Sequence, residues 1–174
     1  MKNFTILGIF LAVFAISCEG PMGPPGINGF DGQDAEIGKT YEIANVNFTA
    51  GANTIIYDFP NNLIDGDAVL VYRLDGIDNG LDVWEPLPTA TIFFDDGGFL
   101  QYRFDYTLEN VAIILDSDNI SLLGNEFTTN QVFRAIVVPS DLISGLDTNN
   151  MFNLMDQLSL NKNNFETLDL KIVE

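Results

Sequence analysis

The sequence predicts an all-β protein, an antiparallel β-sandwich or jelly roll with one short helix, and three observations lead to this fold class. Short runs rich in β-branched and aromatic residues recur along the chain. Turn-forming residues, chiefly Gly, Asp and Asn, separate these runs. The runs do not alternate with helical segments, as a parallel α/β fold would require. We therefore expect about eight strands, spaced about 8 to 15 residues apart, in two packed sheets.

The first three strands are predicted at residues 41–48 (YEIANVNF), 54–59 (TIIYDF) and 67–74 (DAVLVYRL). The segments between them, TAGAN and NNLIDG, are composed mostly of turn-forming residues. Val, Ile, Tyr and Phe favour a pleated surface that is buried on one side. One face of each of these strands is therefore expected to pack in the core.

Residues 91–107 (TIFFDDGGFLQYRFDYT) predict a β-hairpin. Its turn, residues 95–98, contains Asp and Gly, which tolerate positive φ angles. After the turn, apolar and polar side chains alternate with a period of two. The apolar set is Leu100, Tyr102, Phe104 and Tyr106, and the polar set is Gln101, Arg103, Asp105 and Thr107. The sheet is therefore expected to have one dry, aromatic face.

The remaining elements follow from shorter patterns. Residues 111–116 (VAIILD) and 133–138 (FRAIVV) predict strands buried on nearly both faces, and residues 168–173 (LDLKIV) predict a last alternating strand. Residues 149–158 place Met151, Leu154, Met155 and Leu158 at helical spacing, which predicts one short amphipathic helix. Met at these positions is expected to fill the core.

Two acidic segments are candidate calcium sites. Residues 74–82 (LDGIDNGLD) are interpreted as one loop that carries Asp75, Asp78, Asn79 and Asp82, and residues 116–119 (DSDN) form a second acidic turn. Ca²⁺ prefers six to eight hard oxygen ligands, and extracellular sites are built on such loops. The spacing of an EF-hand is not met, and Asp and Asn also form turns by bonding their own backbone. Calcium at the first loop and simple turn formation both remain open.

Residues 83–88 (VWEPLP) hold the single Trp of the chain in a segment interpreted as a Pro-bounded loop. An exposed Trp84 beside Glu85 is expected to stack on a sugar ring, whereas a buried Trp84 would close one end of the core. A hydrolase that uses a pair of carboxylates is the enzyme class that the composition still permits. The 25 acidic residues offer no way to choose such a pair.

The composition excludes several other functions. The chain carries a formal net charge of −18 and only seven Lys and Arg residues, so we expect it to repel nucleic acid and anionic lipid. It has no His, which removes the commonest catalytic base and zinc ligand. Sequence fingerprints of nucleotide-binding and hydrolytic sites are also absent.

Residues 1–17 predict a signal peptide, because Lys2 precedes an apolar run at 4–16 that is too short to span a bilayer comfortably. Residues 15–18 (AISC) follow, and small residues directly before Cys18 resemble the lipobox of bacterial lipoproteins. This resemblance implies that the chain is cut before Cys18 and that this residue is acylated, which anchors the chain to a membrane. The residue after Cys18 is Glu19. In enterobacterial members of this family, Asp at this position retains the protein at the inner membrane, so the resemblance implies an outer-membrane location for a chain with Glu.

A glycine repeat fills residues 18–35, the second predicted segment. Gly20, Gly23, Gly26, Gly29 and Gly32 stand at every third position, as in collagen. Prolines fill only three of the ten other positions, so a semi-stiff spacer is expected, with a homotrimeric triple helix as the alternative. The whole arrangement resembles small collagen-like lipoproteins of Gram-negative bacteria. In these proteins a signal peptide, a cysteine, a short Gly-Pro-rich run and a β-rich domain follow one another, and the β-rich domain here is residues 36–174.

The predicted function is that of a non-enzymatic, lipid-anchored protein of the cell envelope, with a structural or adhesive role. A glycan-binding module is the first alternative and a carboxylate-dependent hydrolase is the second. Apart from the candidate Ca²⁺, no cofactor is expected. Partners are expected to be the membrane, through Cys18, and a protein or a glycan.

Overall fold

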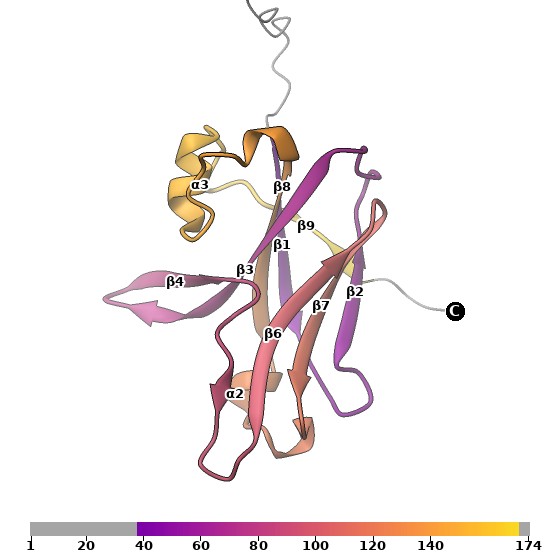
Figure 1. Cartoon of the computed structure of the whole chain (residues 1–174), viewed down its shortest axis with the longest axis vertical. Coiled ribbons are helices and arrows are strands. Elements are labelled where there is room, and N and C mark those ends of the chain that lie inside the picture. The colour runs from indigo at the N-terminus through magenta and orange to yellow at the C-terminus, as the bar shows by residue number, and fades with distance from the viewer. Residues whose placement is uncertain (1–37, 171–174) are drawn as a thin grey trace, which may run out of the picture. The chain divides into compact units, whose positions relative to one another are not determined.

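The computed structural model describes residues 38–170, which form two five-stranded β-sheets (Figure 1). The first sheet has the order β4 (Leu81–Pro86), β3 (Asp67–Asp78), β8 (Gln131–Pro139), β1 (Lys39–Val46), β9 (Glu166–Thr167). The second sheet has the order β10 (Asp169–Leu170), β2 (Thr54–Asp58), β7 (Asn110–Ser117), β6 (Phe99–Tyr106), β5 (Ile92–Phe93). All neighbours are antiparallel except β1 and β9. The prediction of an all-β sandwich is confirmed.

The main hydrophobic core lies between the two sheets. The first sheet contributes Tyr41, Ile43, Val71 and Phe133, and the second contributes Leu100, Tyr102, Val111, Ile113 and Leu115, all of them buried. The predicted alternation in β6 is confirmed at its start, where Leu100 and Tyr102 are buried, whereas Tyr106 at its end is exposed. The core therefore thins toward the end of β6.

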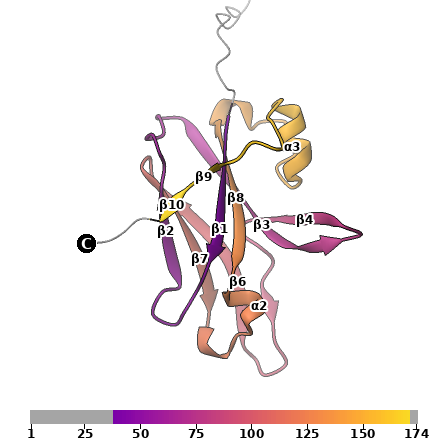
Figure 2. The ribbon, with the colours of Figure 1, turned by 180° about the vertical axis from the view of Figure 1, so that it is seen from behind.

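A second, smaller core covers the outer face of the first sheet. Residues 133, 135 and 137 of β8 face the main core, while Ile136 and Val138 point to the other side. There they pack with Tyr72 of β3 under helix α3 (Met151–Gln157), which contributes Met151, Leu154 and Met155. Figure 2 shows this helix beside one end of β8. The helix predicted at 149–158 is confirmed, and it explains why β8 is apolar on both faces.

Residues 166–170 connect the two sheets on one side of the sandwich. Glu166 and Thr167 pair with β1 in the first sheet, and Asp169 and Leu170 pair with β2 in the second. Leu168 between them is buried in the main core. Of the strand predicted at 168–173, the described part forms only the two-residue β10, whereas β9 precedes the predicted range and residues 171–173 lie outside the described part of the chain.

Three short helical turns close the ends of the sandwich, and the sequence patterns do not predict them. They are η2 (Ile120–Leu122), α2 (Asn125–Thr128) and η3 (Ser140–Leu142). Each has at most four residues, which is too short to show a helical hydrophobic period.

Candidate functional site

A hairpin formed by β3 and β4 projects from the body of the sandwich in both views (Figures 1 and 2). β3 pairs with β8 only from Asp67 to Arg73, and beyond Arg73 it pairs with β4 alone. The interpretation of residues 74–82 and 83–88 as two loops is therefore wrong. The missed signal is the pair Asn79–Gly80, whose positive φ angles of 50° and 83° are typical of a two-residue hairpin turn.

The loop interpretation failed for a physical reason. A bulge between Leu74 and Gly76 leaves Asp75 without a partner across the strand, so the side-chain alternation shifts in the middle of the hairpin. Acidic residues also occupy positions where a strand pattern normally shows β-branched side chains. The local sequence therefore favours a turn although the chain continues as a strand.

The structure does not gather the four candidate calcium ligands. Asp75 binds Nη1 of Arg73 at 3.0 Å, and Asp78 accepts a hydrogen bond of 3.2 Å from the side chain of Asn79. Asp82 lies on the other strand of the hairpin. Within residues 38–170, no group of three or more His, Cys, Asp or Glu side chains is arranged to hold a metal ion.

The strand register keeps two of these carboxylates apart. Asp82 is opposite Ile77, whereas Asp78 is opposite Leu81, one step further toward the turn. Residues directly opposite each other share a face of the ribbon, and successive residues alternate between faces. Asp78 and Asp82 therefore point to opposite faces of the hairpin.

Trp84 contributes to the second core rather than to an exposed platform. Its half-buried ring lies 4.2 Å from the guanidinium of Arg134, and the ring of Phe165 lies 4.1 Å from the same guanidinium. The guanidinium donates two hydrogen bonds, of 3.1 and 3.0 Å, to Oε2 of Glu42. Trp84 and Glu85 are neighbours on β4, so their side chains point to opposite faces. The pair expected to bind a sugar together is thus separated.

The other exposed aromatic side chains do not form a row either. Among the described large hydrophobic residues that are exposed, the aromatic ones are Phe93 and Tyr106. Phe93 pairs with Phe99 at the start of β6, whereas Tyr106 ends that strand. Seven steps along the strand, from residue 99 to residue 106, separate the two ends, a distance of about 23 Å. Phe93 and Tyr106 are therefore too far apart to form one glycan platform.

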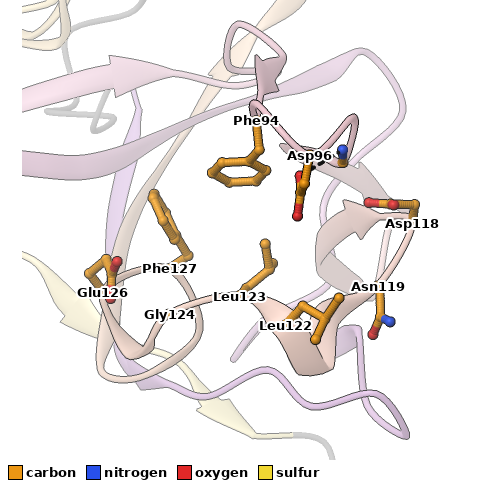
Figure 3. Close-up of a pocket in the computed structure, with 10 residues that line it drawn as sticks. Phe94, Asp96, Asp118, Asn119, Leu122, Leu123, Gly124, Glu126 and Phe127 are labelled. Carbon is orange, nitrogen blue, oxygen red and sulfur yellow. Dashed lines mark hydrogen bonds between the residues drawn. The ribbon is translucent and has the colours of Figure 1, made fainter.

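A pocket of about 220 Å³ lies where the β5–β6 turn meets η2 and α2 (Figure 3). Its apolar part is formed by Phe94, Leu123 and Phe127, with the two rings 5.9 Å apart. At its rim, Asp96 accepts a hydrogen bond from the Gly98 amide at 3.0 Å.

The acidic segment 116–119, the second calcium candidate, reaches the same rim. Asp118 accepts a hydrogen bond from the Phe99 amide at 3.1 Å, and Asn119 caps η2 by accepting from the Ser121 amide. Both side chains therefore stabilise turns, as their residue types favour. The pocket itself brings together segments about 25 residues apart, and the sequence gives no local signal of it.

A buried cation links the two sheets at the base of the hairpin. Arg73 donates from Nε to Gln131 at 3.0 Å and from Nη1 to Asp75, and its guanidinium lies 4.3 Å from the ring of Tyr102. The Tyr102 hydroxyl donates to the carbonyl of Phe127 at 2.6 Å. Burial raises the pKa of Tyr102 to about 12, although the charge of Arg73 acts in the opposite direction.

Tyr72 is the corresponding phenol in the second core. Its hydroxyl donates to the carbonyl of Thr148 at 2.8 Å. Burial, and to a smaller extent the negative charge of Asp147, raise the pKa of this phenol above its ordinary value. Both phenols are neutral structural donors at neutral pH.

The predicted lipid-attachment residue, Cys18, lies outside the described residues. Between residues 38 and 170, no helix is long and apolar enough to cross a membrane. No family model, no curated protein and no solved structure matches the chain.

Proposed function

We propose that this chain is a lipid-anchored protein of the cell envelope. It displays a β-sandwich on a short spacer and has a non-enzymatic, adhesive role. One observation carries this proposal, namely the order of features in the first 35 residues. A charged start and an apolar run precede small residues and Cys18, and the glycine repeat follows directly. The described sandwich supplies the displayed domain.

The anchor has a clear physical basis. Each buried methylene contributes about 0.8 kcal/mol to membrane binding, so one acyl chain holds weakly and two or more hold stably. Residues 20–34 extended as polyproline II would span about 45 Å. The domain would thus stand clear of the lipid head groups, and an outer-membrane location is part of the proposal.

Metabolic labelling tests the anchor directly. The full chain is expressed in a Gram-negative host with labelled palmitate, beside a Cys18→Ala variant as the matched control. We expect label on the wild-type chain in the outer-membrane fraction, and neither label nor membrane retention for the variant. A wild-type chain that takes up no label would refute the proposed anchor.

The spacer and the triple helix give different masses in solution. Residues 19–174 and residues 36–174 are compared by light scattering, and we expect monomers for both, as a spacer requires. A trimer for the longer chain alone would show that the glycine repeat assembles as collagen does.

A further inference from the structure

We propose that the projecting β3–β4 hairpin is the adhesive surface, and that it binds an extended segment of a partner protein in which basic residues alternate with apolar ones. The segment adds as a strand to the outer edge of β4, which is one of the two edge strands of the first sheet. This inference deepens the proposed function and rests on it, since it assigns a partner chemistry to the displayed domain.

The first argument is the backbone of β4. The two-residue turn makes Asp78 and Leu81 a hydrogen-bonded pair, and further along the strand the Leu87 amide donates to the carbonyl of Val71 at 2.8 Å. Hydrogen-bonding groups alternate in direction along a strand. The odd-numbered residues of β4 therefore turn their backbone groups toward β3.

The even-numbered residues of β4 consequently turn their backbone groups away from the sheet. Asp82 and Trp84 each present an amide and a carbonyl outward, and Pro86, which has no amide hydrogen, ends the row. Such a row of unpaired donors and acceptors is the template on which an incoming strand pairs.

The second argument is the apolar surface around this edge. Ile77 and Leu81 are 71% and 72% exposed, and Val83 is 41% exposed. Leu81 and Val83 lie two residues apart on the same face of β4, so an incoming strand brings its own side chains beside both of them. Burying these side chains against a partner removes apolar area that the protein alone leaves in water.

The third argument is charge, which selects the partner. The hairpin from residue 75 to residue 85 carries Asp75, Asp78, Asp82 and Glu85 and no Lys or Arg. Like charges facing each other across a strand pair are unfavourable, so a second copy of this hairpin is repelled. Basic side chains placed beside Asp82, on the face opposite to Leu81 and Val83, are instead attracted.

The chain's own remaining segments are poor occupants of the edge. Residues 19–37 contain four acidic residues and no Lys or Arg, namely Glu19, Asp31, Asp34 and Glu36. Their charge has the same sign as that of the hairpin. The complementary strand is therefore expected to come from another protein.

The test uses the full chain with Cys18→Ala, so that its outcome does not depend on the lipid anchor. A fluorescent peptide of about eight residues that alternates Lys and Val is the probe, and one that alternates Glu and Val is its control. Fluorescence anisotropy at low salt measures both affinities. We expect the basic peptide to bind at least about tenfold more tightly and to weaken as salt is added.

Two pairs of variants locate the binding. Leu81→Lys with Val83→Lys is expected to weaken binding of the basic peptide at least about tenfold. The matched control is Ile92→Lys with Phe93→Lys, which alters an exposed apolar pair on β5, an edge strand of the second sheet, and leaves the affinity unchanged. Equal losses in the two pairs, or none, would overturn the proposal.

A charge exchange is expected to increase the affinity for one peptide, and a misfolded variant would not show such an increase. Asp82→Lys is expected to shift the preference, so that the acidic peptide gains affinity and the basic one loses it. An unchanged preference would contradict the assigned edge. Phosphatidylcholine vesicles test the competing class of partner: vesicle binding that depends on Leu81 and Val83, with no peptide binding, would overturn the proposal in favour of a membrane.

Discussion

Replacing Arg134 by Met tests whether the outer face of the first sheet depends on a stacked guanidinium. The Arg134 side chain is only 15% exposed and lies between the rings of Trp84 and Phe165, at 4.2 and 4.1 Å. Met keeps an unbranched apolar stem of similar length, so the packing of the stem is largely retained. The substitution therefore removes chiefly the charge and its two ring contacts.

The expected loss follows from these contacts. Each cation–π contact that is partly removed from water contributes about 1 kcal/mol. The ion pair with Glu42, whose side chain is 36% exposed, adds up to about 1 kcal/mol. We therefore expect Arg134→Met to lower the free energy of unfolding by about 3 kcal/mol and Tm by about 10 °C.

The assay is urea unfolding followed by the fluorescence of Trp84, the only Trp in the chain, together with far-UV circular dichroism. Arg103→Met is the matched control, because the Arg103 side chain is 41% exposed and pairs with the exposed side chains of Asp105 and Asp116. We expect that variant to lose less than about 1 kcal/mol. Equal losses for the two variants would refute the stacking argument.

Three further predictions concern the turn, the second core and the buried phenol. Gly80→Ala should cost about 1 kcal/mol in urea unfolding, because Gly80 has a φ of 83°, whereas Gly51→Ala, at a position with ordinary φ and open space, should change little. Met155→Ala should cost about 2 to 5 kcal/mol, and a loss below about 1 kcal/mol would contradict its burial between α3 and the first sheet. The folded-state pKa of Tyr102, about 12, lies above the ordinary value of 10.0, so its contribution to stability is complete below pH 10.0 and is lost as the pH rises toward 12. Tyr102→Phe should therefore make stability fall less steeply between these pH values, and an unchanged slope would argue against the raised pKa.

The strands predicted from local patterns are those whose side chains meet a core on a regular period. Leu100 and Tyr102 alternate with polar residues because β6 has one buried face. Ile136 and Val138 add a second buried face to β8, and the run of apolar residues follows from that. A strand that packs against a core therefore shows a recognisable hydrophobic pattern in its sequence.

The β3–β4 hairpin and the stacked guanidinium of Arg134 show no such pattern in the sequence. β4 is an edge strand with exposed side chains, so no core imposes a period on it, and the bulge at Asp75 breaks the remaining alternation. Trp84, Arg134 and Phe165 meet only because α3 and the strands fold around them, although they lie far apart in the chain. The candidate site could therefore be recognised only from the strand register of the structure and not from local sequence patterns.

The crossing of residues 166–170 between the two sheets also affects the order of folding. Ribosomes synthesise a chain from its N-terminus, so β9 and β10 are made after every other described strand. Until then, the edges of β1 and β2 that they cover remain open, and the main core lacks Leu168. The sandwich can thus close on this side only at a late stage of synthesis, when both edges are covered and Leu168 completes the main core.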